Sequence, residues 1–173
     1  MTGFQIQGWC PGALRPMLSG DGLVVRVRPM GGRLTQTQAT GIATAATRHG
    51  NGLIDLSARG NVQLRGVTPG SHPALIADLR ALDLIDADAL AEARRNILVT
   101  PFATPETDAL AANLAHALQD APVLPGKFGF VLDCAAAPIA DARAWSSATN
   151  VRASRSATER PTSMRMRSSI ERS

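Results

Sequence analysis

An alternation of apolar and cationic residues near the start of the chain is the feature that most limits its fold. Residues 23–28 read LVVRVR, in which Val25 and Val27 alternate with Arg26 and Arg28. Successive side chains of a strand point to opposite faces of the sheet. We therefore expect a strand here, with the valines on a buried face and both arginines on a polar face.

A helix is expected directly after this strand. Thr35 and Gln38 have the spacing of a capping box, in which each residue caps the backbone of the other. Apolar residues then repeat at helical spacing until HGNG ends the pattern, and this stripe consists of Ala39, Ile42, Ala43 and Ala46. The pattern predicts a helix of about three to four turns.

Two more strands and a second helix complete the first pattern. Residues 53–56 and 61–67 read as short strands, and the polar sequence SARG connects them. Ser71 and Pro73 then open a helix whose apolar stripe is Leu75, Ile76, Leu79 and Leu82. Both helices on one side of a small antiparallel sheet predict a ferredoxin-like α+β unit, whose fourth strand must come from elsewhere in the chain.

A second pattern begins near residue 89. DADALAEARR favours a helix and NILVT a strand, after which Thr104 and Pro105 open another helix. The stripe of that helix is Leu110, Leu114, Ala117 and Leu118, and FGFVLD predicts a final strand. Residues 89–141 therefore indicate the opening of a further domain whose remaining elements are absent.

The net charge of +4 is concentrated at the carboxyl end. Residues 1–142 carry a net charge of −1, whereas residues 143–173 hold seven arginines and two glutamates. From Trp145 onward the text shows little periodicity, and we expect it to be disordered. It is either a basic arm or an out-of-frame end, and the abrupt change favours the second interpretation. The slightly acidic remainder argues against binding of nucleic acid.

The composition and the few cysteines exclude several classes of protein and cofactor site. No run of 18 apolar residues and no signal peptide is present, which predicts a cytoplasmic protein that does not enter a membrane. Cys10 and Cys134 are the only cysteines, too few for a four-thiolate cluster. The three histidines lack metal-ligand spacing, so no metal site is assigned.

Polar residues recur at regular spacing along the third predicted strand and the connection before it. Arg59, Asn61, Gln63 and Arg65 recur at every second position, so an extended chain directs all four to one face. Arginine forks match carboxylates and small oxyanions, and Arg26 and Arg28 would widen the same surface. The alternative is a polar sheet face that simply contacts water. The pattern alone favours this alternative.

Four segments resemble a known family in their order along the chain. GDGLVVRVRPMGGRLT and HGNGLIDLSARGNVQLRGV resemble the ferredoxin-like half-domain of nitrite and sulfite reductases, while RRNILVT and LPGKFGFVLD resemble the start of the adjoining cofactor domain. The resemblance implies an α+β half-domain at 10–84, the incomplete start of a [4Fe-4S]/tetrapyrrole domain at 89–141, and a basic tail at 143–173.

The resemblance also implies a binding pocket. In that family the arginine of the (S/T)xRxNxQ strand, the arginine of RNxLxT and the lysine of LPxKF line an anionic tetrapyrrole pocket. Here they match Arg59, Arg95 and Lys127, and Arg65 is a weaker candidate. Without the resemblance, Arg95 reads as a helix-end residue and Lys127 as a solvated one. No catalytic residue is assigned.

One difference points to a branch of the family. Sulfite reductases usually carry a second lysine two residues after the first, where this chain has Gly129. The KFGF form and the short start resemble precorrin-3B synthases, which carry a [4Fe-4S] cluster and hydroxylate precorrin-3A with oxygen in aerobic cobalamin biosynthesis.

The cluster cysteines of those enzymes lie beyond the end of this chain. We therefore expect a truncated front portion, inactive alone unless a companion polypeptide supplies the rest, with an anionic tetrapyrrole as its ligand. The alternatives are a fragment of a siroheme-dependent sulfite or nitrite reductase, and a non-catalytic tetrapyrrole-binding module.

Overall fold

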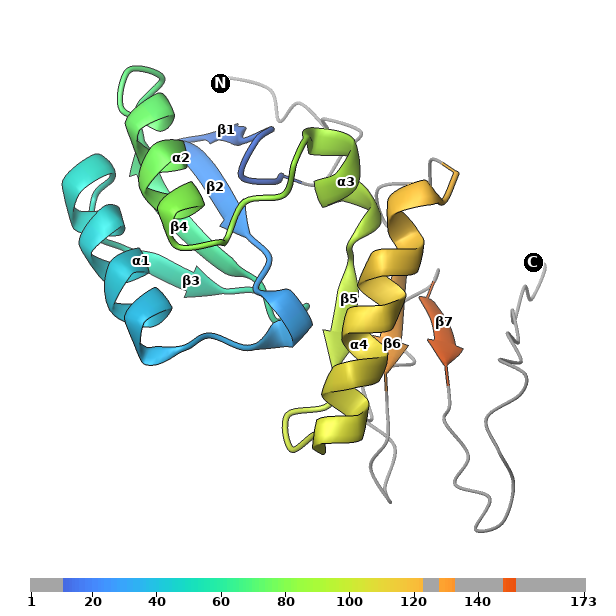
Figure 1. Ribbon diagram of the computed structural model, residues 1–173. Helices are drawn as coiled ribbons and strands as arrows, with labels where there is room; N and C mark the ends of the chain where they lie inside the picture. The colour runs from blue at the N-terminus through green and yellow to red at the C-terminus, as the bar shows by residue number, and fades with distance from the viewer. Residues whose placement is uncertain (1–10, 123–127, 133–147, 152–173) are drawn as a thin grey trace, which may run out of the picture.

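The chain forms two sheets, one after the other. Among the described residues, the buried charged side chains are Arg28, Glu92 and Arg95, and they lie where the two sheets meet. The computed structural model describes residues 11–122, 128–132 and 148–151. Within them an antiparallel four-stranded sheet is followed by a parallel three-stranded sheet (Figure 1). The α+β class predicted from the sequence is confirmed.

The first sheet contains one strand that the sequence did not reveal. Its spatial order is β1 (Met17–Ser19), β2 (Gly22–Val27), β4 (Val62–Val67) and β3 (Ile54–Leu56), and all neighbours are antiparallel. The missing fourth strand is β1, which forms a tight hairpin with β2. A three-residue strand is too short to show an alternation, so only its pairing with β2 identifies it.

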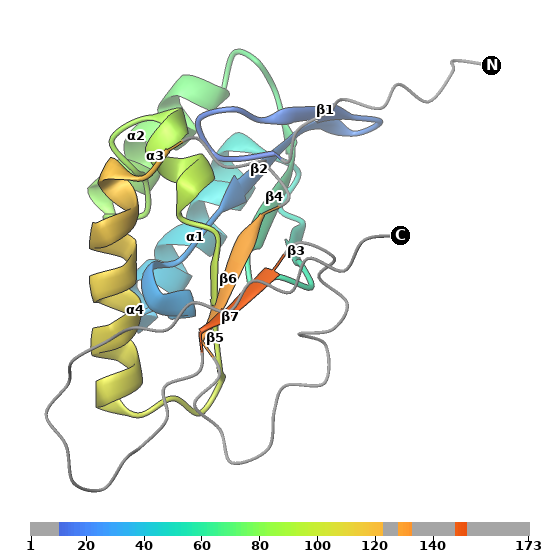
Figure 2. The same cartoon turned by 90° about the vertical axis from the view of Figure 1, so that its right-hand side faces the viewer.

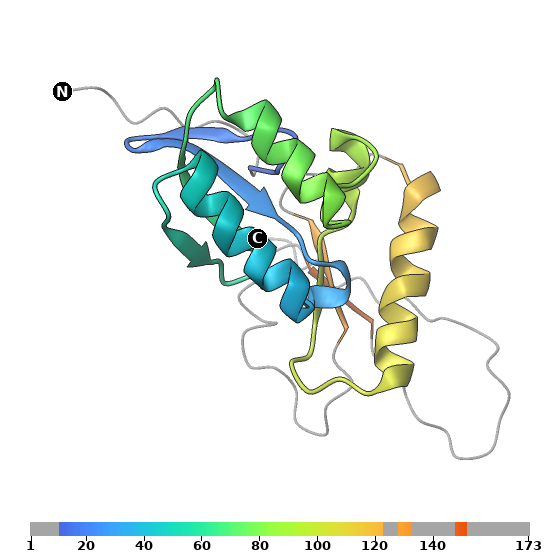
Figure 3. The same cartoon turned by 60° about the vertical axis from the view of Figure 1, so that its left-hand side comes forward.

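Two helices cover one face of this sheet. Helices α1 (Gln36–His49) and α2 (His72–Ala81) lie side by side over β2 and β4 (Figures 1 and 3). The predicted capping box is present, because the Gln38 N–H donates to Thr35 Oγ1 at 3.1 Å and the Thr35 N–H donates to Gln38 Oε1 at 3.0 Å.

The buried stripe of α1 differs from the predicted one. Ile42, Ala45 and Ala46 are buried, whereas Ala39 and Ala43 are exposed. Alanine occupies positions on several sides of this helix, so the sequence pattern could not fix which side faces the sheet. The first core is aliphatic and joins the apolar face of the sheet to both helices. Its largest fully buried members are Val25, Val27, Leu64, Val67, Leu75 and Leu79.

A second, smaller core lies in the later part of the chain. Its elements are α3 (Ala89–Arg94), β5 (Ile97–Val99), α4 (Pro105–Ala117), β6 (Gly129–Leu132), β7 (Ala148–Val151) and the short 3₁₀ helix η2 (Leu118–Asp120). Strands β5, β6 and β7 are parallel, and α4 lies along one side of them (Figure 2). The buried members of this core are Val99, Ala111, Leu114, Leu118, Phe130 and Leu132.

Strand β7 corrects one expectation. Residues after 143 were expected to be disordered, yet Ala148–Val151 pair in parallel with all of β6. Backbone groups make the ladder of a sheet, so a strand at its edge does not need an alternating side-chain pattern. The remaining residues of the tail lie outside the described part of the chain.

The outer edge of the first sheet is bare among the described residues. Strand β3 pairs only with β4, and Leu53, Ile54 and Leu56 at this edge are exposed. Leu56 is the most exposed of the three, at 80%. Ile54 and Leu56 stand opposite Leu64 and Val62, so they extend the apolar side of the sheet beyond its helical cover.

Candidate functional site

A polar surface lies on the side of the first sheet that faces away from α1 and α2. Val25 and Val27 point to the core, which places Arg26 between them on the opposite face. Arg26 stands directly across from Gln63, and its Nε and Nη2 atoms donate to Gln63 Oε1 at 3.1 and 2.6 Å. A neutral amide therefore helps to orient this guanidinium.

Arg65 belongs to the same surface but is held by carboxylates. Its Nε atom lies 3.2 Å from Asp21 Oδ2 and 3.7 Å from Asp55 Oδ2. Partial burial works to raise the pKa of Asp21, but its hydrogen bonds and the charge of Arg65 together lower it below the ordinary value. The charge of Arg65 is thus shared between two acids, which weakens it as a ligand for a further anion.

Arg59 lies in a hairpin loop, which corrects the predicted row of four residues. The loop spans 57–61 between β3 and β4: the Ser57 N–H donates to Asn61 O at 2.8 Å, and Gly60 adopts a φ of +66°. The left-handed turn at Gly60 breaks the extended chain, so the two-residue period begins only after it. Asn61 is buried at 6% exposure, and only Gln63 and Arg65 of the row lie along the strand.

The hairpin loop approaches the second sheet. A Cβ atom added to Gly60 would lie 3.4 Å from Leu98 Cδ1 in β5, so the backbone beside Arg59 lies close to that strand. Only Asn96 separates Arg95 from the start of β5 at Ile97. The elements that carry Arg59 and Arg95 are therefore neighbours, as the predicted pocket requires.

The side chain of Arg95, however, is engaged inside the protein. Its Nε and Nη2 atoms donate to the two carboxylate oxygens of Asp86 at 2.7 and 2.8 Å, and Nη2 also donates to Arg28 O at 2.8 Å. Arg95 is 8% exposed, and the side chain of Asp86 is similarly buried. In this arrangement Arg95 joins the end of β2, the segment before α3 and the start of β5, and we call this contact region between the two sheets the junction. Its fork is occupied by Asp86 rather than offered to a ligand.

Glu92 forms the second buried contact of this junction. Its carboxylate accepts hydrogen bonds from the backbone N–H groups of Ala13 and Leu14. Gly12 passes so close that an added Cβ would lie within 2.8 Å of the carboxyl carbon and both its oxygens. Burial raises the pKa of Glu92, although these hydrogen bonds and the charge of Arg28 act in the opposite direction. Residues 12–14 are therefore fixed against α3.

Arg28 was expected on the polar face of the first strand, and that expectation is wrong. The strand ends at Val27, and Arg28 is buried at the junction, where its Nη1 atom donates to the backbone oxygen of Glu92. Burial lowers the pKa of Arg28, while the charge of Glu92 raises it. Alternation along a strand predicts the face of a residue only as far as the strand extends.

Sequence reasoning missed the two pairs that organise these surfaces. The Arg26–Gln63 pair depends on the register between β2 and β4, and burial of Glu92 depends on the approach of residues 12–14. A glutamate in an alanine-rich helix resembles any solvated glutamate. The short Cys-Pro-Gly sequence at 10–12 marks a close backbone approach, but nothing in it indicates the partner.

Some predicted site features lie outside the described residues. Lys127 is one, and Cys10 and Cys134 are others. A [4Fe-4S] cluster needs four thiolates, and the whole sequence contains two, so the residues of this chain do not fit that cofactor. Among the described residues no group of acids, histidines or cysteines has the arrangement of a metal site.

The described helices also set a limit on membrane contact. None of those in residues 11–122 is both long enough and apolar enough to cross a bilayer.

Comparison with known proteins agrees with the fold. Residues 15–82 match the family described as the nitrite/sulfite reductase ferredoxin-like half domain. The precorrin-3B synthase of Sinorhizobium sp. is 43% identical over 105 residues, which represent 61% of this chain and 22% of that protein. The chain thus matches about a fifth of the length of this relative. Its antiparallel sheet with two helices, residues 15–82, thus matches the ferredoxin-like half domain of nitrite and sulfite reductases, in a chain that is similar to a precorrin-3B synthase.

Proposed function

We propose that this chain binds an anionic tetrapyrrole on the helix-free face of its first sheet, as the front portion of a precorrin-3B synthase-like oxidoreductase. The observation that carries this proposal is the cross-strand pair of Arg26 and Gln63, with Arg59 in the adjoining hairpin loop. A guanidinium already oriented by an amide loses little freedom when it donates hydrogen bonds to a carboxylate. A modified tetrapyrrole carries many carboxylates, which suits a surface with several arginines.

The reaction proposed for the complete enzyme is the oxygen-dependent hydroxylation of precorrin-3A. The similarity to a precorrin-3B synthase favours this reaction over siroheme-dependent reduction of sulfite or nitrite. Gly129, where sulfite reductases carry a lysine, supports the same choice. The cluster for this reaction would require thiolates beyond the two in this sequence, so we assign this chain the macrocycle-binding role and no catalytic residue.

The residues of the proposed site differ in their roles. Arg26 and Arg59 are the proposed contacts for ligand carboxylates, and Lys127 is proposed as a third on the strength of the family resemblance. Arg65 is proposed as a secondary contact because Asp21 and Asp55 already share its charge. Arg95 is proposed to position the segments around the site, because Asp86 and a backbone oxygen occupy its donors.

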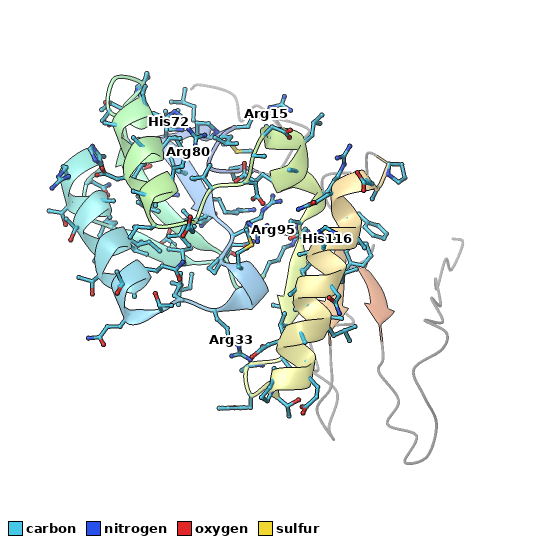
Figure 4. All side chains as sticks on the ribbon, viewed as in Figure 1. Arg15, Arg33, His72, Arg80, Arg95 and His116 are labelled. Carbon is cyan, nitrogen blue, oxygen red and sulfur yellow. The ribbon has the colours of Figure 1, made fainter. Side chains whose placement is uncertain are left out.

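Replacing Arg59 by alanine should weaken binding of a polycarboxylate porphyrin such as uroporphyrin by about 1 to 3 kcal/mol. The expected loss is that of one charge-assisted, often bidentate contact. Quenching of porphyrin fluorescence during titration measures the dissociation constant directly. The matched control is Arg80→Ala on α2, which removes the same charge from an exposed position on the helical side of the sheet (Figure 4).

The control variant should bind the porphyrin as the unchanged protein does. If both variants lose the same affinity, and both losses disappear at high salt, the binding reflects general charge and no site exists on this face. If the unchanged protein does not bind the porphyrin at all, the proposed function is wrong.

A further inference from the structure

A separate cleft opens on the opposite side of the junction, between the segment 85–88, α3 and α4. Its volume is about 870 Å³, within the range of roughly 300 to 1,000 Å³ that is usual for small-molecule sites. Its lining does not include Arg26, Gln63 or Arg65 of the first sheet, or Arg59 of the hairpin loop. Five of its lining residues are alanines, whose short side chains leave open apolar space between the elements, namely Ala87, Ala91, Ala111, Ala112 and Ala115.

The acidic side chains that line this cleft all have partners, whereas two of its basic side chains form no ion pair among the described residues. Each of its aspartates already has a partner: Asp86 binds Arg95, Asp108 binds Arg33 at 2.9 Å, and Asp88 accepts the first N–H groups of α3. Arg94 and His116 also line the cleft, and neither forms an ion pair with a carboxylate among the described residues. Figure 4 shows His116 and Arg95 along the same gap beside α4.

The guanidinium of Arg94 has one hydrogen-bond donor for which the described residues provide no acceptor. Its Nη1 atom donates to Gln119 O at 2.9 Å, whereas its Nε atom is buried and has no hydrogen-bond partner within the described part of the chain. A buried donor without an acceptor is costly in free energy. The edge formed by Nε–H and Nη2–H is the one that binds a carboxylate through two parallel hydrogen bonds.

We propose that this cleft binds a small organic anion, with a flat apolar body between the alanine walls and a carboxylate or sulfonate at Arg94. A modest rotation of the partly exposed Arg94 side chain turns its unused donor edge toward the ligand. His116 stands nearby as a second donor. This site is distinct from the tetrapyrrole site proposed above, because none of the ligand contacts proposed there lines the cleft, and Arg95, which does line it, has its donors occupied by Asp86 and a backbone oxygen.

A pair of fluorescent probes tests the proposal. The anion 8-anilino-1-naphthalenesulfonate and its uncharged counterpart N-phenyl-1-naphthylamine share the same apolar body and differ in the sulfonate. The unchanged protein should bind the anion roughly tenfold more tightly, because a charge-assisted hydrogen bond adds to the apolar contact. In Arg94→Gln this preference should disappear, while Arg80→Gln on α2 should retain it.

Filling the cleft tests its location. Ala115→Phe places a ring between the walls and should abolish binding of both probes, and Ala112→Phe is a second plug in case the first variant does not fold. Circular dichroism establishes folding of each variant. Arg59→Ala should leave both dissociation constants unchanged, which separates this proposal from the tetrapyrrole site. Unchanged probe binding in a folded plug variant, or an equal preference for the anion in Arg94→Gln, would overturn the proposal.

Discussion

Replacing Glu92 by alanine should lower the free energy of unfolding by about 3 to 5 kcal/mol, which is a large part of the stability of a domain of this size. The substitution removes the acceptor of the buried Ala13 N–H and the half-buried Leu14 N–H, and it removes a carboxylate whose charge stabilises the charged form of Arg28. Each buried donor that loses its partner costs about 1 to 3 kcal/mol. Chemical denaturation followed by circular dichroism measures the change.

The same residue gives the stability a defined dependence on pH. Because the pKa of Glu92 is raised in the folded protein, the folded state binds its proton more tightly than the unfolded state. Its contribution to the free energy of unfolding is therefore fully present below the ordinary pKa and falls as pH rises through the folded-state pKa. The difference between the unchanged protein and Glu92→Gln should accordingly shrink as pH rises above the ordinary glutamate pKa of 4.5.

An exposed glutamate supplies the control for this prediction. Glu106→Ala in the first turn of α4 should cost far less than Glu92→Ala, about 1 kcal/mol at most, because Glu106 is exposed. An equally small effect at Glu92 would mean that residues 12–14 are not fixed against α3. A difference from Glu92→Gln that grows with pH would contradict the sign of the pKa shift.

Replacing Arg95 by alanine should also lower the free energy of unfolding by about 3 to 5 kcal/mol, because Asp86 would remain buried as an unpaired charge. The backbone oxygen of Arg28 would lose a donor as well. Lysine at position 95 should recover only part of the loss, since an ammonium group cannot form the two parallel bonds of a guanidinium. The same denaturation measurement applies.

Two further variants compare the buried ion pair of Arg95 and Asp86 with an exposed ion pair. Arg33→Ala breaks the exposed ion pair with Asp108 and should cost about 1 kcal/mol at most. The double variant Arg95→Met with Asp86→Leu removes both buried charges and should be far more stable than Arg95→Ala alone. If Arg95→Ala left the stability unchanged and abolished porphyrin binding instead, Arg95 would be a ligand contact rather than a positioning residue.

Local patterns were sufficient to predict most of the first unit. The capping box at Thr35 and Gln38 gave the start of α1, and the alternation around Val25 gave β2, because both signals depend only on neighbouring residues. Strand β1 and strand β7 were missed, because each is defined by pairing with another strand rather than by its own side chains.

The site was harder to predict than the fold because it depends on contacts between distant residues. Gln63 was expected on the polar face, but its hydrogen bonds to Arg26 follow from strand register. Arg59 and Arg28 were placed by extending a strand period past its true end, in one case into a hairpin loop and in the other into a buried junction. Matching Arg95 to a motif identified an important residue, but not the buried carboxylate that holds it.

Within the described residues strand β3 pairs on one side only, and this edge affects how the protein behaves in solution. An unpaired strand edge offers free backbone groups to another chain, and natural sheets usually protect such edges with charges, prolines or bulges. Here Leu53, Ile54 and Leu56 stand exposed at the edge instead, with Asp55 partly engaged by Arg65. Concentrated protein should therefore associate edge to edge through β3. A lysine in place of Leu56 would act as a gatekeeper against this aggregation and leave the aliphatic core of the sheet intact.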